Sequence, residues 1–551
     1  MRTTRRLCSG IAILASLALT HRSAAQVFGI QQAAPFPIHS QATINDTRSH
    51  GTVGDRWLSL REAMLLTNRQ LDENALSAEE LAQLSGFGSD IAWADIDARR
   101  LPVIVVERDL PVLIDTPHGF ALTGSNGRPV IELGNTRGIV AHSEFVDFAN
   151  LLLRGGEHGI HLVQSNTLYG SLVSHCEFEG QAVAGLRLTT LDPAGFARLQ
   201  VNSCVFRGLQ LGLLVEDSGQ NRTTQLEVFG TTRFDGCTTG LAARFGALGT
   251  ASLYLAGIVA RGGAHAIDIS SLGSPQRSLA IEMRYCDLEG SVSAFVVPGS
   301  PLSNCIATVQ ACDFGAPRAF EFGPLGAQGN FTLQDSRFVG ALTWRGGASG
   351  RLAIQNVRAS NGRFDVGSTG ASLTIDTSIL DGIDVATSGT TPLTVRDSRL
   401  IAGTVTGLAA APITVQDGHA SGTNFGGHVT VLRPLPAAQL GWFDATPREP
   451  AIGSALTLAV DLPAGLAAWL IFGRTYEYGA TLPDGTRLYV DPSAMAIAPA
   501  MLVAQGQLVV PLPNDPAFRG LDLFFHALVF PQGGTVAPAT NLPPGRRVRI
   551  R

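Results

Sequence analysis

The sequence contains no lysine, and all 40 of its basic residues are arginines. A lysine Schiff base, a lysine general base and the lysine of a phosphate-binding loop are therefore excluded. Aromatic side chains that stack on sugar rings are also scarce, because only 6 Tyr and 5 Trp occur among 551 residues.

Charged residues are sparse too, at 15% of the chain, whereas 45% is hydrophobic and 62 residues are glycine. This composition is typical of a β-rich protein with many tight turns. The net charge of −5 indicates no basic patch, so we expect no nucleic-acid partner. A chain of this length predicts two or three units or one long repeat array.

Residues 1–25 have the pattern of a secretory signal. Arg5 and Arg6 precede an apolar stretch, 10–20, that is too short to span a bilayer. Small residues up to Ala25 then suit a cleavage site. We expect cleavage near Ala25 and a protein that is secreted or held at the cell surface. No later stretch predicts a membrane span.

Two short phrases recur along the middle of the chain. The first has a small residue or Cys, one further residue, then Phe or Leu and soon Gly, as at 174–180, 202–208 and 284–290. The second is apolar-x-apolar and follows each copy of the first. Its first apolar position falls at Ile160, Leu186, Leu213, Leu241, Ile267, Phe295, Phe320, Leu342, Phe364 and Ile383, with Thr404 as a weak last member.

The steps between these positions range from 28 to 19 residues and shorten along the chain. Alternation with period two predicts short strands with one buried face. The steps match neither a leucine-rich repeat nor a propeller blade of roughly 40 residues. They fit coils of two or three strands, stacked about 4.8 Å apart. We expect an all-β chain whose residues 101–431 form a tapering, right-handed parallel β-helix of about 11–13 coils.

The repeats resemble those of the pectate-lyase-like superfamily over roughly residues 100–431. Upstream, Ser59 and Glu62 predict a capping box at the start of a short helix. That segment resembles the S-L-R-E-A motif of secreted bacterial β-helix proteins, although Leu58 stands where they often have Cys. The resemblance implies the fold and no single activity, because the superfamily holds lyases, hydrolases, adhesins and scaffolds.

The two ends of the repeat array predict separate units. Residues 26–100 are expected to form an N-terminal cap with a helical insertion, since an open β-helix end needs a cover. Four prolines between 432 and 450 indicate a linker. Residues 451–551 alternate as strands with turn signals between them, which predicts an antiparallel β-sandwich-like module.

Six cysteines follow the signal segment. Cys176 and Cys204 hold equivalent positions in successive coils, and so do Cys286 and Cys312. Stacked Cα atoms about 4.8 Å apart permit disulfides, and export permits oxidation. The alternative is an inward column of small buried thiols, which Ser336 in the same position favours. The spacings match no zinc signature.

The middle residue of the apolar-x-apolar phrase is expected to point outward. His161 beside Arg187 could supply a base and an anion clamp, with His158 and His175 nearby. The glycines on both sides of His158 favour a turn residue over a ligand. Isolated charges on an outer face, however, commonly only solvate the strand. The whole predicted column is His161, Arg187, Leu214, Ala242, Asp268, Val296, Glu321, Thr343, Asp365 and Asp384.

Asp268 is a further ligand-binding candidate in this column. Asp365 and Asp384, on neighbouring coils, are weak candidates for a calcium site. Their expected spacing also approaches the roughly 5 Å that separates the carboxylates of a retaining glycosidase. They fall in the narrowest coils, however, so we otherwise expect no metal and no cofactor.

Two functions remain open from the sequence. The first is an exported, monomeric scaffold, adhesin or glycan-binding protein whose partner is an extracellular polysaccharide or a cell-surface component. The second is a polysaccharide lyase or glycoside hydrolase that acts along the outer face of the wide N-terminal coils. The first is favoured by the regular repeat and the sparse polar clusters.

Overall fold

A computed structural model describes most of the chain, and residues 1–25, where a signal segment is expected, lie outside the described part. Described residues are 40–85, 91–114, 119–142, 145–164, 170–191, 195–217, 222–246, 249–271, 278–346, 350–370, 372–434, 442–446, 450–462, 466–473, 496–503, 506–518, 521–531 and 546–550.

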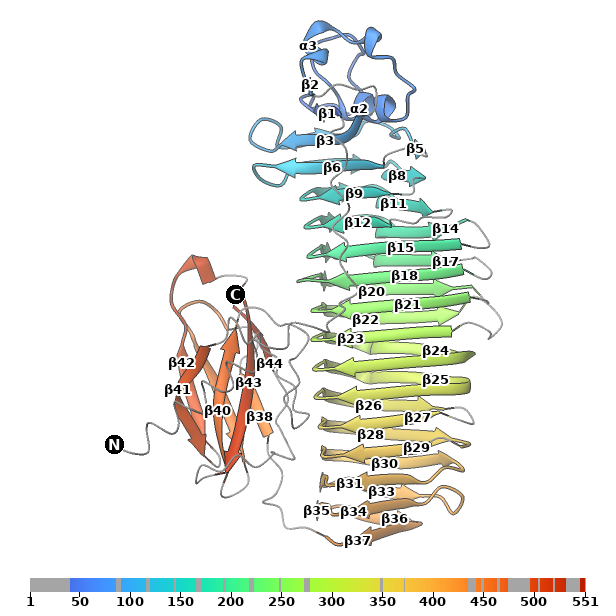
Figure 1. Ribbon diagram of the computed structural model, residues 1–551, viewed down its shortest axis with the longest axis vertical. Helices are drawn as coiled ribbons and strands as arrows, with labels where there is room; N and C mark the ends of the chain where they lie inside the picture. Colours follow the sequence, from blue (N-terminus) through green and yellow to red (C-terminus); the bar gives the residue numbers. More distant parts are fainter. Residues whose placement is uncertain are drawn as a thin grey trace, which may run out of the picture.

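The body of the protein is a parallel β-helix, seen in Figure 1 as a rod of stacked arrows. Each coil contributes strands to three parallel stacks, which we name A, B and C. Stack A contains β5 (Leu113–Ile114), β8 (Ile139–His142), β11 (His158–Gln164), β14 (Ala184–Thr190), β17 (Leu211–Asp217), β20 (Thr239–Phe245), β33 (Thr404–Gly407) and β36 (Asn424–Gly427).

Stacks B and C complete the coils. Stack B contains β1 (Ser40–Thr43), β3 (Ile91–Asp97), β6 (Phe120–Ser125), β9 (Val146–Ala149), β12 (Ser171–Ser174), β15 (Gly195–Asn202), β18 (Arg222–Phe229), β21 (Gly249–Ala256), β23 (Ser278–Arg284), β27 (Arg351–Gln355), β29 (Ser372–Asp376), β31 (Leu393–Arg396), β34 (Ile413–Gln416) and β37 (Val429–Leu432). Stack C contains β4 (Val103–Val105), β7 (Val130–Gly134), β10 (Leu152–Gly155), β13 (Glu177–Glu179), β16 (Val205–Arg207), β19 (Arg233–Asp235), β32 (Arg399–Ile401) and β35 (His419–Ser421).

Several strands in the middle of the rod bend through more than one stack, because their backbone pairing continues round the corner. They are β22 (Val259–Ser271), β24 (Asp287–Gln310), β25 (Asp313–Gln334), β26 (Arg337–Arg345), β28 (Arg358–Ser368) and β30 (Ile379–Gly389).

The inward columns pair as the repeat predicts for most of the rod. Ile160 aligns with Leu186, and this column continues in register as far as Phe364. The last two positions were wrong, because the structure aligns Phe364 with Val385 and Val385 with Val405. The apolar pattern alone did not distinguish the correct alignment from a shift of one or two residues.

Phenylalanines of the first phrase form a stacked column inside the rod. The Phe178 and Phe206 ring centroids are 4.8 Å apart, and those of Phe206 and Phe234 are 4.9 Å apart. All three side chains are buried. Parallel pairing without a register shift places identical side chains one above another, so the rings stack face to face.

The corner between stacks B and C is a single residue in the left-handed conformation, and most of these residues are not glycine. Its N–H donates to a carbonyl of the next coil, as from His175 to Asn202 at 2.8 Å, so the backbone ladder passes round the corner unbroken. The non-glycine members of this column are Asn150, His175, Ser203, Tyr285, Ala311, Asp335, Asn356, Thr377, Asp397 and Asp417.

This column also measures the taper of the rod. His175 and Ser203 are 28 residues apart, whereas Asp397 and Asp417 are only 20 apart. The expected shortening of the coils is therefore present in the structure.

The N-terminal end of the rod is covered. Helix α2 (Leu60–Thr67) begins at the predicted capping box, in which Glu62 N–H donates to Ser59 Oγ at 3.2 Å and Ser59 N–H donates to Glu62 Oε2 at 2.8 Å. Leu60 and Met64 are buried in the same apolar core as the first coils. A second capping box precedes α3 (Ala78–Leu81), and η1 (Glu73–Ala75) and β2 (Leu84–Ser85) complete this region.

The C-terminal part contains two antiparallel sheets with an apolar core of their own. One sheet contains β38 (Trp442–Thr446), β39 (Ala455–Asp461) and β42 (Gln507–Pro511), and the other contains β40 (Leu466–Gly473), β41 (Ala496–Val503), β43 (Asp522–Pro531) and β44 (Arg546–Arg549), with η3 (Pro516–Phe518) between strands.

None of the helices in the described part of the chain has the length and apolar character needed to cross a membrane.

The outer face of stack C carries charges of alternating sign, which we name the charge column. Its members are Glu132, Arg154, Glu179, Arg207, Asp235, Arg261 and Glu289. Arg154 pairs with Glu132 at 2.8 Å and with Glu179 at 3.1 Å. Each side chain therefore has neighbours of opposite charge, which avoids the repulsion of like charges on adjacent strands.

Removing one ring from the phenylalanine column should destabilise the rod. We expect Phe206→Ala to lower the free energy of unfolding by about 3–5 kcal/mol, because it leaves a cavity between two stacked rings. Urea unfolding followed by circular dichroism measures the change. Val205→Ala, an outward substitution on the same strand, is the control and should cost less than about 1 kcal/mol. Equal losses would show that the stacked rings are not a special source of stability.

Reversing one sign in the charge column should cost a smaller, salt-dependent amount. Arg207→Glu puts three acidic side chains on consecutive strands, and we expect a loss of about 1 kcal/mol at low salt. The loss should shrink in 1 M NaCl, where the screening length is about 3 Å. Arg207→Gln, which removes the charge without reversing it, should cost less. A loss that does not depend on salt would contradict an electrostatic origin.

Candidate functional site

The candidate residues His161 and Arg187 lie side by side on the outer face of stack A. His161 is on β11 and pairs in register with Arg187 on β14. The next members of this column, Leu214 and Ala242, follow on β17 and β20. The prediction from the sequence that His161 lies beside Arg187 is therefore confirmed.

His161 is held as a neutral ring. Its Nε2 lies 2.9 Å from the Thr189 hydroxyl, which is two residues beyond Arg187 on the same outer face. Burial of the ring and the nearby Arg187 guanidinium lower the pKa of His161 to about 3. A ring with this pKa is a weak base, so it is poorly matched to proton abstraction near neutral pH.

Arg187 is engaged on two sides. Its Nη2 lies 2.7 Å from Glu216 Oε2, and its Nη1 lies 3.1 Å from His158 Nε2. Glu216 also pairs with Arg244 on the next coil, at 3.3 Å. The guanidinium is therefore fixed in one orientation by a carboxylate and an imidazole before any ligand arrives.

His158 belongs to this group as the first residue of β11, although the sequence favoured a turn position for it. Its ring is 2% exposed, and its centroid lies 5.2 Å from that of His161. Burial and the Arg187 charge lower the pKa of His158 as well. Both rings are therefore neutral hydrogen-bonding groups at ordinary pH, and the positive charge of the site belongs to the arginines.

The other two candidates are not part of this group. His175 is the exposed corner residue between β12 and β13, which stack with different strands from β11. Asp268 lies three coils beyond Arg187 in the same column, about 14 Å away at the spacing of stacked strands. The sequence already placed Leu214 and Ala242 between Arg187 and Asp268, and the pairing of the strands confirms this order.

An apolar patch borders the arginine. Leu214 and Ala242 were expected to point into solvent, but they are only 3% and 5% exposed. They pack with Ala184, and Val183 and Leu211 lie against this small cluster. The site thus combines a fixed guanidinium and hydroxyl with a buried aliphatic cluster, of which only Val183 and Leu211 are partly exposed.

The proposed pairing of Asp365 and Asp384 was wrong. Asp365 aligns with Ala386, and Asp384 aligns with Arg363, so the two carboxylates do not share a column. Arg345 binds both oxygens of Asp365, at 3.0 and 2.6 Å. Asp384 Oδ1 accepts hydrogen bonds from the Thr404 N–H and hydroxyl, at 2.8 and 2.6 Å. No group of three or more metal-ligating side chains occurs among the residues that the structure describes.

Thr189, Glu216 and Arg244 were missed from the sequence although they complete the site. They occupy the next outward position along the strands, two residues beyond the predicted column. Extending the period-two alternation by one step would have found them. Nothing in the pattern, however, indicates that Glu216 binds Arg187 and Arg244 together.

A second outward column, on stack B, was also missed. It contains Trp93, Ala121, Asp147, Leu172, Gln200, Glu227, Tyr254 and Glu282. Trp93 is 49% exposed, and its Nε1–H donates to Thr123 Oγ1 at 3.0 Å. Burial raises the pKa of the Asp147 carboxyl to about 6.

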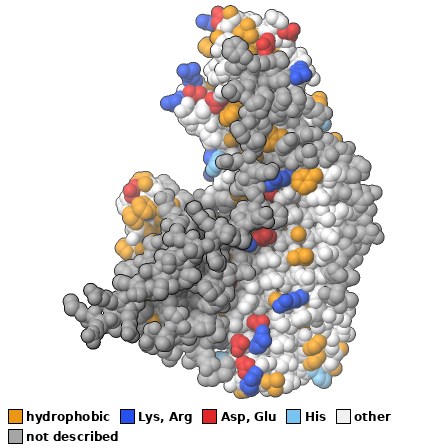
Figure 2. Space-filling view, viewed as in Figure 1, with side chains coloured by type: hydrophobic (Ala, Val, Ile, Leu, Met, Phe, Trp, Pro, Cys, Tyr) orange, Lys and Arg blue, Asp and Glu red, His pale blue; other side chains and the backbone are white. Residues whose placement is uncertain are grey.

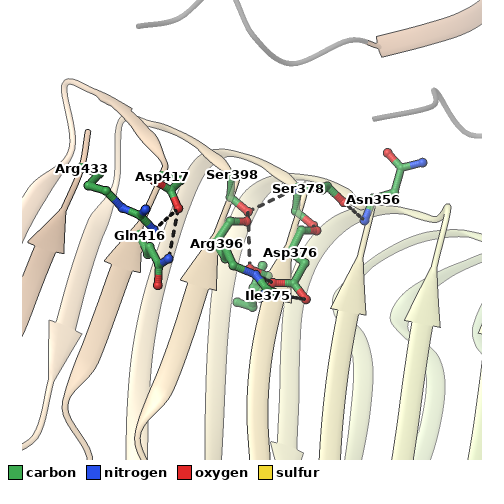
Figure 3. A network of polar contacts seen from close by, with 10 residues as sticks. Asn356, Ile375, Asp376, Ser378, Arg396, Ser398, Gln416, Asp417 and Arg433 are labelled. Atoms are coloured by element: carbon green, nitrogen blue, oxygen red, sulfur yellow. Dashed lines mark hydrogen bonds and ion pairs between the residues drawn. The ribbon is translucent and has the colours of Figure 1, made fainter. Parts of the chain in front are cut away.

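Further along stack B the polar side chains bond to one another. Glu227 accepts hydrogen bonds from Gln200 at 2.6 Å and Arg198 at 2.8 Å. In the C-terminal coils Arg396 binds both oxygens of Asp376 at 3.1 Å, and Asp417 accepts a hydrogen bond from Arg433 at 2.7 Å (Figure 3). These polar side chains are engaged in ion pairs and hydrogen bonds that link neighbouring coils.

The cysteines are buried free thiols. All six in the described part of the chain are unpaired with one another, including Cys176 and Cys204, which occupy adjacent coils, and Cys286 and Cys312. Cys286 N–H donates to the Cys312 sulfur at 3.4 Å, and Cys312 N–H donates to the Ser336 hydroxyl at 3.1 Å. Burial raises the pKa of the Cys176 thiol to about 12. The same slot therefore accepts sulfur or hydroxyl because either one receives the N–H of the preceding coil.

Comparisons with known proteins do not assign the chain to a family. No protein-family model, no curated protein and no solved structure matches it.

Thiol reactivity should distinguish buried thiols from disulfides. In the native protein without residues 1–25, we expect all six thiols to resist Ellman's reagent near pH 8, because burial keeps them protonated and covered. Denaturation in guanidinium without reductant should then release six reactive thiols. Release of only two would show that Cys176–Cys204 and Cys286–Cys312 are disulfides.

Proposed function

We propose that this protein is an exported, non-catalytic β-helix protein of the pectate-lyase-like, secreted bacterial type that binds glycans. Its site of action is outside the cell or at a cell surface, where the rod serves as a scaffold or adhesin. Export is supported by the signal pattern of residues 1–25. The regular coils provide a rigid, elongated face that suits an extended polymer.

The observation that carries the proposal is the state of the group around Arg187. A lyase needs a base of suitable pKa and a free cation for the uronate. Here His161 has a pKa of about 3, and Glu216 already engages the guanidinium. Fixed donors beside the partly exposed side chains of Val183 and Leu211 are suited to hydroxyl groups and apolar ring faces, which is the chemistry of sugar binding rather than cleavage.

The acid–base pair of a glycosidase has no support in the outward column of stack A. Two carboxylates must face one substrate about 5–9.5 Å apart. Asp365 and Asp384 lie in different columns and are both engaged. The alternative of a lyase or hydrolase therefore becomes an outcome of the test below.

Binding and cleavage should be measured on the same panel of uronate and neutral polysaccharides, with and without Ca²⁺. We expect a glycan to bind without new reducing ends or absorbance at 232 nm. Arg187→Ala should weaken binding by about tenfold, the effect of losing a hydrogen bond to a charged group. Arg154→Ala, which removes an arginine with two ion pairs on stack C, is the matched control and should leave binding unchanged.

The pH dependence provides a second readout. Because burial lowers the pKa of His161 to about 3 and lowers that of His158 below its ordinary value of 6.5, both rings stay neutral above neutral pH, and binding through this group should not change between pH 7 and pH 8. Cleavage products from any polysaccharide would overturn the non-catalytic assignment. Absence of binding across the panel would overturn the glycan ligand.

A further inference from the structure

The C-terminal end of the rod exposes its apolar interior. Each inward column is buried up to the last coil but one, where Leu400, Val405 and Val415 are at most 2% exposed. The next member of two of these columns is open, with Phe425 and Val431 each 40% exposed. Ala420, which follows Leu400 in the third column, is exposed as well. All three stacks therefore end on uncovered core side chains.

The backbone of the last coil is also incompletely paired. Ile413 N–H donates to the His428 carbonyl, and Asp417 N–H donates to the Leu432 carbonyl. In a parallel ladder alternate residues bond to opposite neighbours. The N–H and C=O groups of Val429 and Val431 consequently face away from β34, toward the open end. An edge of this kind is a template for another strand.

The two ends of the rod differ. At the N-terminal end α2 covers the core, and β1 pairs with the antiparallel β2. That cover prevents the open end of one rod from stacking on the N-terminal end of another, so a head-to-tail filament is excluded. Among described residues, the rod core and the core of the C-terminal sheets are separate clusters, so those sheets do not complete the last coil.

We propose that the open end docks against the same end of a second copy, which makes the protein an end-to-end dimer. The contact buries the exposed apolar side chains and pairs the free strand edges, as neighbouring coils do, but the two-fold relation makes the paired end strands antiparallel where the coils within the rod are parallel. A two-fold axis brings identical patches together, and such an isologous contact closes after two copies. The proposal replaces the monomer expected from the sequence and does not depend on glycan binding.

Charge at the rim is compatible with this symmetry. Arg433 pairs with Asp417 at 2.7 Å and remains 68% exposed. Figure 2 shows acidic and basic side chains next to one another over the lower coils. Because both signs are present at the rim, two identical ends can meet without placing only like charges opposite each other.

The test is sedimentation velocity of the full chain without residues 1–25, over a range of concentrations. Val431→Lys puts a charge on the exposed apolar column, and Val431→Pro removes an N–H that faces the open end and has no use within the rod. Both should raise the dimer dissociation constant by about tenfold or more. Thr430→Lys, an outward change on the same strand, is the matched control and should leave it unchanged.

Circular dichroism and the thermal transition of each variant should match those of the parent, because residue 431 lies at an exposed edge. A parent protein that sediments as a monomer at every concentration would overturn the proposal. A dimer that tolerates both Val431 substitutions would overturn it too, since its interface would then lie elsewhere. Loss of the dimer in the Thr430→Lys control alone would likewise place the contact on the outer face.

Discussion

Parallel backbone pairing between successive coils is the interaction on which the rest of this structure depends. Each strand places its residues directly above their equivalents, about 4.8 Å away. A side chain therefore has the corresponding side chain of the next coil as its principal neighbour. The phenylalanine column, the slot shared by Cys312 and Ser336, and the charge column all follow from this one constraint.

The corners show how strictly the pairing is kept. A left-handed residue between stacks B and C allows the N–H to donate to the next coil, and non-glycine residues such as Tyr285 and Ala311 adopt it repeatedly. This conformation is unfavourable for a residue with a Cβ atom. The continuous backbone ladder and the buried columns on both sides evidently outweigh that cost. The coil can then shorten from 28 to 20 residues without losing its corner, because the changes in length fall elsewhere.

The same constraint limits chemistry on the rod. Polar groups that stack so closely tend to neutralise one another, as Arg187 does with Glu216 and Arg345 does with Asp365. What remains is a stiff surface of oriented donors and acceptors, which supports recognition of an extended partner. The backbone pairing between coils ends at both ends of the rod, and the two ends differ. Helix α2 covers the core at the N-terminal end, whereas Phe425 and Val431 are exposed at the C-terminal end.

The parallel β-helix, its taper, the N-terminal capping box at Ser59 and the pairing of His161 with Arg187 could all be predicted from the amino-acid sequence. These features are local: strand alternation, repeat length and capping depend on residues close together in the chain. The alignment of Asp384, the ion pair between Arg187 and Glu216, and the burial of Leu214 were decided only by the tertiary structure. Each depends on which residues of neighbouring coils face one another, and a degenerate apolar pattern with coils of changing length permits more than one such alignment.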